Sequence, residues 1–282
     1  MIRIISDSTC DLSDELKERF NISILPLHVL LGEKEYKDGV DITLPELFAW
    51  ADENKTTPKT SAPSMEDAVN LFKPIIDAGD EIIAFSISDT MSTSGNVMRL
   101  AAAEIEAEDK VSVIDSQNLS TGIGLLVCKA AEYVEQGLSR SEVVAKIEEL
   151  RPKVRASFVV DTLTYLHRGG RCSGVAAFAG SALKLHPRIA VVDGNMQPGK
   201  KYRGKYSSVV LNYVKDMEPE IKNADPTRVF ITYTGVAPEV EASVKEYLEQ
   251  LNIFDEICIT RAGGTIASHC GYGTLGVLFI VK

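Results

Sequence analysis

Residues 81–115, EIIAFSISDTMSTSGNVMRLAAAEIEAEDKVSVID, carry the pattern that decides the fold class. An apolar strand is expected over 81–86, an alanine-rich helix beginning at Ser92 or Thr93, and a second strand over 111–115. Strands joined through a helix of this length form a right-handed crossover, which places them parallel in one sheet. The stretch therefore predicts an α/β protein with a mainly parallel sheet.

The same alternation extends to both sides of this stretch. On the N-terminal side we expect strands over 2–6 and 24–31, a hairpin partner over 34–37, and helices over 13–20, 43–54 and 64–78. The segment 55–63 is interpreted as a polar connection. On the C-terminal side, helices are expected over 121–136 and 139–150.

A change of pattern after Pro152 predicts two domains, 1–152 and 153–282. A chain of 282 residues exceeds the usual single-core length, and proline disfavours helical geometry at Arg151 before it. The second domain is expected to be α/β with a mixed or antiparallel sheet. Its expected strands cover 156–160, 189–192, 228–233, 256–260 and 277–281, and its helices cover 162–167, 207–218 and 239–251.

The charge balance argues against two classes of partner. Thirty basic and forty acidic residues leave a formal net charge of −10, which opposes a nucleic-acid backbone or an anionic membrane surface. No segment approaches the ~18 apolar residues of a membrane span. We therefore expect neither nucleic-acid binding nor stable membrane insertion. The one basic cluster, residues 200–205, is either a solvated loop or a contact patch for an acidic partner or a phosphate.

Cysteine usage and the N-terminus indicate the compartment. The five cysteines, at positions 10, 128, 172, 258 and 270, are odd in number, lie far apart and lack C-x-x-C spacing, which disfavours a disulfide framework or a metal site. The N-terminus lacks the basic and apolar stretches of a signal peptide. We expect reduced cysteines in a cytoplasmic protein without bound metal.

Four hydroxyl-rich turns occur where strands end, over 6–9, 60–64, 88–96 and 115–118. Ligands of a doubly wound sheet bind outside the carboxyl ends of the strands, where such turns gather. Each serine or threonine alone is better explained as a helix N-cap. Several of them meeting at one place would form a ligand site.

His269 lies in a glycine-rich stretch, HCGYGTLG over 269–276, just before the last expected strand. The literal G-x-G-x-x-G is not a dinucleotide fingerprint, because that motif must open a helix and only six residues follow. The stretch is either a tight turn with an incidental histidine or a flexible turn that brings an imidazole close to a ligand. Hydroxyls, helix N-terminal N–H groups and an imidazole together can hold a carboxylate.

Two further segments leave alternatives open. The small residues over 174–183 permit either close helix packing or room for a long apolar guest. Arg168-Gly169-Gly170-Arg171 fits either a helix C-cap or an anion-facing turn. Metalloprotease, P-loop and nucleophile-elbow motifs are missing from the sequence. A second hypothesis is an acyl hydrolase in which Ser92 pairs with His269 and Asp7 orients the imidazole.

Five blocks in order resemble the DegV family over nearly the full chain. They are Ser6-Asp7-Ser8, Thr60-Ser61-x-Pro63-Ser64, the Ser92 loop, Gly169-Gly170-Arg171 and His269-x-Gly271-x-Gly273. The resemblance implies a two-domain α/β fold that buries one fatty acid in a tunnel and catalyses no reaction itself. It implies a partner, an ATP-using fatty acid kinase subunit that phosphorylates the carboxylate. It also implies delivery of the acyl-phosphate to an acyltransferase of phospholipid synthesis.

The resemblance also assigns roles to residues. Thr60 or Ser61 and Ser92 would bind the carboxylate, His269 would complete that network, and Arg171 would lie nearby. Arg203 would contact the kinase. Three departures bear on the pocket and its last turn: Ser92-Thr93-Ser94 replaces the usual Ser-Gly-Thr, Ala62 replaces a common glutamine, and Tyr272 replaces a common proline. No cofactor is implied besides the fatty acid as ligand.

Overall fold

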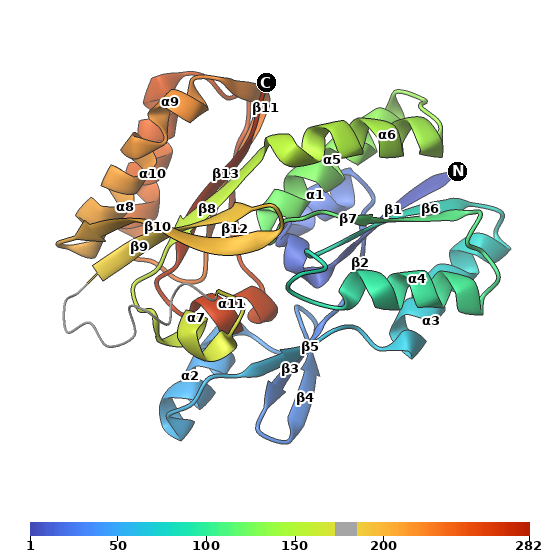
Figure 1. The fold of residues 1–282 in the computed structure, drawn as a ribbon, viewed down its shortest axis with the longest axis horizontal. Coiled ribbons are helices and arrows are strands. Elements are labelled where there is room, and N and C mark those ends of the chain that lie inside the picture. The colour runs from blue at the N-terminus through green and yellow to red at the C-terminus, as the bar shows by residue number, and fades with distance from the viewer. Residues whose placement is uncertain (173–184) are drawn as a thin grey trace.

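The first sheet is four-stranded and parallel, as the 81–115 pattern predicts. The computed structural model describes residues 1–172 and 185–282. The strand order is β2-β1-β6-β7, with β1 (Ile2–Asp7), β2 (Ser23–Leu25), β6 (Glu81–Ser86) and β7 (Val111–Asp115). Helices α3 (Met65–Asp77) and α4 (Ser94–Glu104) cover one face, and α1 (Asp14–Arg19), α5 (Thr121–Glu135) and α6 (Arg140–Leu150) cover the other (Figure 1).

The second sheet is six-stranded and mixed, in the order β10-β9-β8-β13-β11-β12. Its strands are β8 (Val154–Val159), β9 (Leu185–Val192), β10 (Asn195–Arg203), β11 (Ala224–Tyr233), β12 (Ile257–Arg261) and β13 (Leu275–Val281). Only β11 and β12 pair in parallel within this sheet. Helices α8 (Tyr206–Asp216), α9 (Glu218–Ile221) and α10 (Pro238–Leu251) cover its outer face (Figure 1). The expected α/β class with a mixed second sheet is confirmed.

Helix α5 lies between the two sheets and joins their cores. Ile123, Leu126 and Val127 are fully buried in one cluster that contains Ile83 and Phe85 of β6 together with residues of β8 and β13. A helix that is apolar on nearly all sides belongs in such a position. The short turn η2 (Arg151–Lys153) leads from α6 into β8, and the domain division at this point remains a prediction.

A third, three-stranded sheet corrects two sequence expectations. It consists of β3 (His28–Leu31), β4 (Lys34–Lys37) and β5 (Lys59–Ser61), with α2 (Leu44–Asn54) beside it (Figure 1). The single strand expected over 24–31 is wrong, because Pro26 has no N–H to continue a ladder and the chain changes sheets there. The polar connection expected over 55–63 contains β5, which pairs with β3 although it lacks apolar alternation.

Two expected loops are regular structure. His269 lies in helix α11 (Gly264–Cys270), and the glycine-rich turn begins only at Gly271. The start of this helix could not be predicted from the sequence, because Gly263 and Gly264 lie there and glycine is the weakest ordinary helix former. Lys200 to Arg203 belong to the edge strand β10, whose pairing with β9 shifts register between Pro198 and Lys201. Helix α7 (Thr164–Gly169) begins two residues later than expected.

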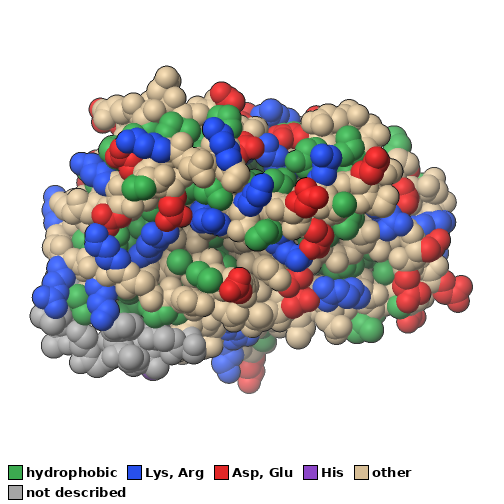
Figure 2. Space-filling view, turned by 45° about the horizontal axis from the view of Figure 1, so that its top comes forward, with side chains coloured by type: hydrophobic (Ala, Val, Ile, Leu, Met, Phe, Trp, Pro, Cys, Tyr) green, Lys and Arg blue, Asp and Glu red, His purple; other side chains and the backbone are tan. Residues whose placement is uncertain are grey.

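The surface in Figure 2 shows acidic and basic side chains interspersed. Such mixing produces no single-sign field over that face. Within residues 1–172 and 185–282, no helix is both long and apolar enough to span a membrane. Among the same residues, no group of three or more His, Cys, Asp or Glu side chains is arranged to hold a metal ion.

Candidate functional site

A cavity of about 500 Å³ lies at the carboxyl ends of the parallel strands, against helix α11. This is where ligands of open α/β sheets bind, and the volume is that of a small-molecule site. Its lining comes from both sides of Pro152: Leu27, Thr60, Ser61, Ala62, Ile87, Asp89, Thr90, Met91, Ser92, Thr93, Leu119, Arg171, Met196, Thr265, Ile266, His269 and Cys270. The five ligand residues expected from the sequence therefore share one cavity.

His269 and Thr60 form the central polar contact of this cavity. Nε2 of His269 lies 2.8 Å from Oγ1 of Thr60. Burial and the nearby Arg171 guanidinium lower the pKa of His269 to about 4, so the imidazole is neutral at pH 7. Its Nδ1 is buried and has no hydrogen-bond partner among the described residues. A buried N–H without an acceptor is rarer than an unused lone pair, which favours the proton on Nε2 and leaves the Thr60 hydroxyl hydrogen for a ligand.

Glycines shape the backbone around His269. A Cβ on Gly169, in the last turn of α7, would lie 2.5 Å from Nδ1 of His269. Gly271 and Gly273, after α11, have φ values of +80° and +78°, which favour glycine. A Cβ on Gly271 would also lie 2.6 Å from Cδ2 of Tyr165. The small residues of both motifs thus let α7 and α11 approach each other.

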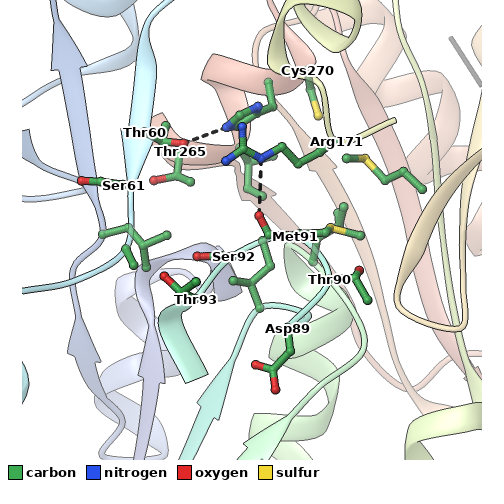
Figure 3. A pocket seen from close by; sticks show the side chains of 17 residues that line it. Thr60, Ser61, Asp89, Thr90, Met91, Ser92, Thr93, Arg171, Thr265 and Cys270 are labelled. Atoms are coloured by element: carbon green, nitrogen blue, oxygen red, sulfur yellow. Dashed lines mark hydrogen bonds between the residues drawn. The ribbon is translucent and has the colours of Figure 1, made fainter. Parts of the chain in front are cut away.

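Arg171 contributes a positive charge without a carboxylate partner among the described residues. It follows the left-handed cap Gly170 of α7, and its NH1 donates to the Gly169 carbonyl at 2.9 Å while Nε donates to the Met91 carbonyl at 3.4 Å. Asp89, which also lines the cavity, pairs with Arg99 at 3.0 Å. Gly170 therefore caps helix α7, and Arg171 after it lines the cavity (Figure 3).

Ser92 and Thr93 open helix α4 at the cavity wall. Ser92 Oγ accepts a hydrogen bond from the Ser94 N–H at 3.3 Å, whereas Thr93 makes no side-chain cap bond. Figure 3 shows Ser92, Thr60 and Arg171 around the same space. Of the three departures from the family pattern, Thr93 and Ala62 line the cavity. Tyr272 does not.

Two of the four hydroxyl-rich turns, 60–64 and 88–96, line the cavity together with His269, whereas the turns over 6–9 and 115–118 do not. Asp7 is fully buried and accepts bonds from Ile87 N at 2.9 Å and Ser94 Oγ at 2.8 Å, besides those from Thr9. Burial raises its pKa. Because Asp7 is occupied in this way and His269 bonds to Thr60, the hypothetical relay of Ser92, His269 and Asp7 is not formed.

Thr265 is a cavity residue that the sequence did not reveal. It lies four residues before His269 in α11, a spacing that places both on one helix face. Its Oγ1 is buried without a partner among the described residues. The threonine-histidine spacing would have indicated the pair only if residues 264–270 had been recognised as helical.

Apolar side chains cover much of the remaining wall, including Leu27, Ile87, Met196 and Ile266. A second cavity of about 20 Å³ shares Leu119, Ile266 and Cys270 with the first. Hydroxyls and one guanidinium on one side and apolar walls on the other suit an amphipathic anion. Residues 174–183, where room for an apolar guest was one alternative, fall outside the described residues.

Arg203 lies apart from the cavity. It is the last residue of the edge strand β10, is exposed, and pairs in the ladder with Leu185. The expected basic loop is therefore largely a strand edge.

Comparison with known proteins assigns the family. The family model described as "Uncharacterised protein, DegV family" matches residues 1–282. This chain belongs to the DegV family. A DegV domain-containing protein of Clostridium acetobutylicum is 34% identical, covering 100% of this chain and 99% of the relative. One from Clostridium perfringens is 30% identical, covering 99% of this chain and 98% of the relative.

Solved DegV structures share the whole fold. A DegV family protein from Thermus thermophilus, described by its fatty acid binding, superposes with a TM-score of 0.91 at 30% identity, covering 100% of this chain and 99% of that one. A stearic acid-binding protein from Eubacterium ventriosum gives a TM-score of 0.88 at 31% identity, with the same coverage.

Proposed function

We propose that this DegV-family chain binds one long-chain fatty acid in the 500 Å³ cavity. The carboxylate would lie at Thr60, Ser92 and Arg171, with Ser61 at the same wall and His269 behind Thr60. The acyl chain would lie among the apolar side chains toward Leu119. The observation that carries the proposal is the Thr60–His269 contact beside a guanidinium that has no carboxylate partner among the described residues. The descriptions of the Thermus and Eubacterium relatives support it.

Chain burial supplies the affinity in this proposal. The roughly 14 methylenes of a sixteen-carbon chain contribute about 11 kcal/mol at ~0.8 kcal/mol each, before the entropy of association is subtracted. The polar groups then fix the direction of the ligand, because a carboxylate is costly to bury without donors.

The proposed role is presentation of the carboxylate to a separate, ATP-using fatty acid kinase subunit in the cytoplasm. A carboxylate oxygen would attack the γ-phosphorus of ATP on that partner, ADP would leave, and an acyltransferase would consume the acyl-phosphate. Hydroxyl donors and a neutral imidazole hold a carboxylate without protonating it, which keeps it nucleophilic. The cavity would lie between the proposed domains 1–152 and 153–282, and the chain itself would supply no catalytic residue.

Calorimetric titration of the fatty-acid-free protein with palmitic acid tests the binding. We expect one saturable site per chain for palmitic acid, and roughly 10- to 100-fold weaker binding of hexadecane, which buries the same chain but lacks the carboxylate that the hydroxyls and Arg171 would hold. Equal binding of both compounds would contradict the assigned polar contacts. Absence of palmitate uptake in protein shown to be folded would contradict the function itself.

A serine-directed fluorophosphonate separates the carrier from the hydrolase. We expect Ser92 to remain unlabelled and acyl esters to remain intact, because Ser92 Oγ bonds to the Ser94 N–H and no hydrogen bond links it to His269 within the described residues. Peptide mass spectrometry after labelling reads this out. Labelling of Ser92 with ester turnover would restore the hydrolase hypothesis.

A further inference from the structure

Helix α11 contributes Thr265, Ile266, His269 and Cys270 to the cavity wall, and its N-terminus is held by carboxylates that do not line that cavity. Asp38 accepts hydrogen bonds from Gly264 N at 2.6 Å and Thr265 N at 3.1 Å. Asp11 accepts one from Gly263 N at 2.7 Å. Anionic oxygens at a helix N-terminus satisfy free N–H groups and oppose the positive end of the helix dipole.

The two carboxylates are also hydrogen-bonded to segments that contribute other parts of the cavity wall. Ser8 Oγ donates to Asp38 Oδ2 at 3.0 Å and accepts from Leu27 N at 3.0 Å, and Leu27 lines the cavity. Ser120, beside the cavity residue Leu119, donates to Asp11 Oδ2 at 2.5 Å. One network thus connects three stretches of the cavity wall.

The fit around Asp38 is tight. Asp38 is 2% exposed, and an uncompensated carboxylate at such a depth would be strongly unfavourable. A Cβ on Gly263 would lie 3.0 Å from Asp38 Oδ1, and one on Gly264 would lie 3.1 Å from the same atom. A larger residue at either position would require the carboxylate to shift by a few tenths of an ångström.

We propose that Asp38 is a positioning residue for the fatty-acid site, acting through helix α11 on the imidazole of His269. Its carboxylate fixes the first turn of a seven-residue helix, and His269 lies in the next turn. The relation of that imidazole to Thr60 thus depends on where the helix begins. This inference rests on the proposed fatty-acid function only for its effect on affinity.

Asp38 and Asp11 differ in the number of hydrogen bonds that they accept. Asp38 uses both oxygens to accept three hydrogen bonds. An asparagine there would place its NH₂ group either against the Ser8 hydroxyl and the Thr265 N–H or against the Gly264 N–H. Asp11 accepts one bond at each oxygen. An asparagine at position 11 keeps both, because its carbonyl accepts from Gly263 N and its NH₂ donates to the Ser120 hydroxyl.

The experiment compares Asp38→Asn with Asp11→Asn by ¹⁵N NMR of the His269 imidazole in the full-length, fatty-acid-free protein. Thr60→Val defines the spectrum of an imidazole without its threonine partner. We expect Asp38→Asn to shift the His269 Nε2 resonance toward that of Thr60→Val, and Asp11→Asn to leave it in place. An unchanged resonance in folded Asp38→Asn would overturn the proposal. So would equal shifts in both asparagine variants.

Palmitic acid titration provides the functional arm. We expect about tenfold weaker binding by Asp38→Asn, the scale of one lost hydrogen bond to a charged group, and less than twofold change for Asp11→Asn. The loss should be non-additive with His269→Ala in a double-mutant cycle. Full additivity would mean that Asp38 acts elsewhere and would overturn the proposal.

Two further controls keep the test decisive. If Asp38→Asn does not fold, Ser8→Ala, which removes one of the three bonds, should produce the same NMR shift in smaller degree, and no shift would overturn the proposal. If the wild-type protein bound no palmitate, the proposed function would fail. The NMR comparison would still decide the positioning role.

Discussion

His269 is the residue whose environment makes the clearest prediction. Its pKa is lowered to about 4, mainly by burial and to a lesser extent by Arg171. In the unfolded chain, the imidazole is protonated with a pKa near 6.5. The unfolded state therefore binds more protons between these values, and stability is lost as pH falls through that window. We expect a loss of about 3 kcal/mol from this residue, complete near pH 4.

Chemical denaturation of fatty-acid-free protein between pH 4 and 7 measures this effect as the difference between wild type and His269→Gln. The buried carboxyls of Asp7 and Asp11, whose pKa values are raised by burial, are present in both proteins and cancel in the difference. A difference in the free energy of unfolding that stays constant across the window would show that His269 is not buried as a neutral group.

Thr60 offers the matched test of the polar contact. Thr60→Val removes the hydroxyl with little change of shape, so palmitate affinity should fall by roughly 10- to 100-fold, the range for a hydrogen bond to a charged group. Thr56→Val, at an exposed position of the same segment, should change affinity by less than twofold. Similar losses in the two variants would mean that the hydroxyl of Thr60 does not contact the carboxylate.

The sequence identified Thr60, Ser92 and His269 because each belongs to a recognisable block of residues. It could not identify Asp38 or Thr265. Two of the three partners of Asp38 are backbone N–H groups 226 and 227 residues away, and such groups are the same for every residue type except proline. Only the fold brings them together.

At the scale of elements, the packing of α7 against α11 depends on Gly169. Gly169→Ala would place a Cβ 2.5 Å from Nδ1 of His269, whereas Gly170→Ala meets no atom within 4 Å but must adopt a φ of +69°. We expect the first change to weaken palmitate binding several-fold and to lower the free energy of unfolding by roughly 1–3 kcal/mol, because the added methyl group overpacks a buried contact.

The neighbouring change should lower stability without weakening palmitate binding. Gly170→Ala should lower the free energy of unfolding by roughly 1 kcal/mol through backbone strain while leaving affinity within twofold. Calorimetric titration and chemical denaturation of both variants measure the two effects. If Gly170→Ala lowers affinity more than Gly169→Ala, the assigned contact between α7 and His269 is wrong.

Sequence periodicity located the long elements and failed on the short ones. Capping boxes at Thr43 and Ser139 were followed by helices as expected, because those signals are local. The break at Pro26, the polar strand β5 and the seven-residue helix α11 were not found. The strand and the helix are stabilised mainly by partners distant in sequence: β5 by β3, and α11 by Asp11 and Asp38.

At the scale of the whole molecule, the proposed lipid site and the proposed kinase contact are separate. Arg203, at the end of the edge strand β10, does not line the cavity. We expect Arg203→Ala to preserve palmitate affinity and to slow kinase-dependent acyl-phosphate formation, most strongly at low salt, because a rim charge mainly affects encounter.

Lys153→Ala is the charge-matched control for Arg203→Ala, since Lys153 is exposed in η2. It should change neither quantity. The paired measurements are palmitate titration and phosphate transfer with the kinase of the same organism. Loss of lipid binding with intact kinase coupling in Arg203→Ala would reverse the division of roles.

The most direct test of fatty-acid binding is mass spectrometry of the ligand extracted from freshly purified protein, quantified against the chain. We expect close to one long-chain fatty acid per chain, depleted in Thr60→Val purified in parallel. Extracts that contain only solvent, from folded protein that also takes up no palmitate on titration, would contradict the account.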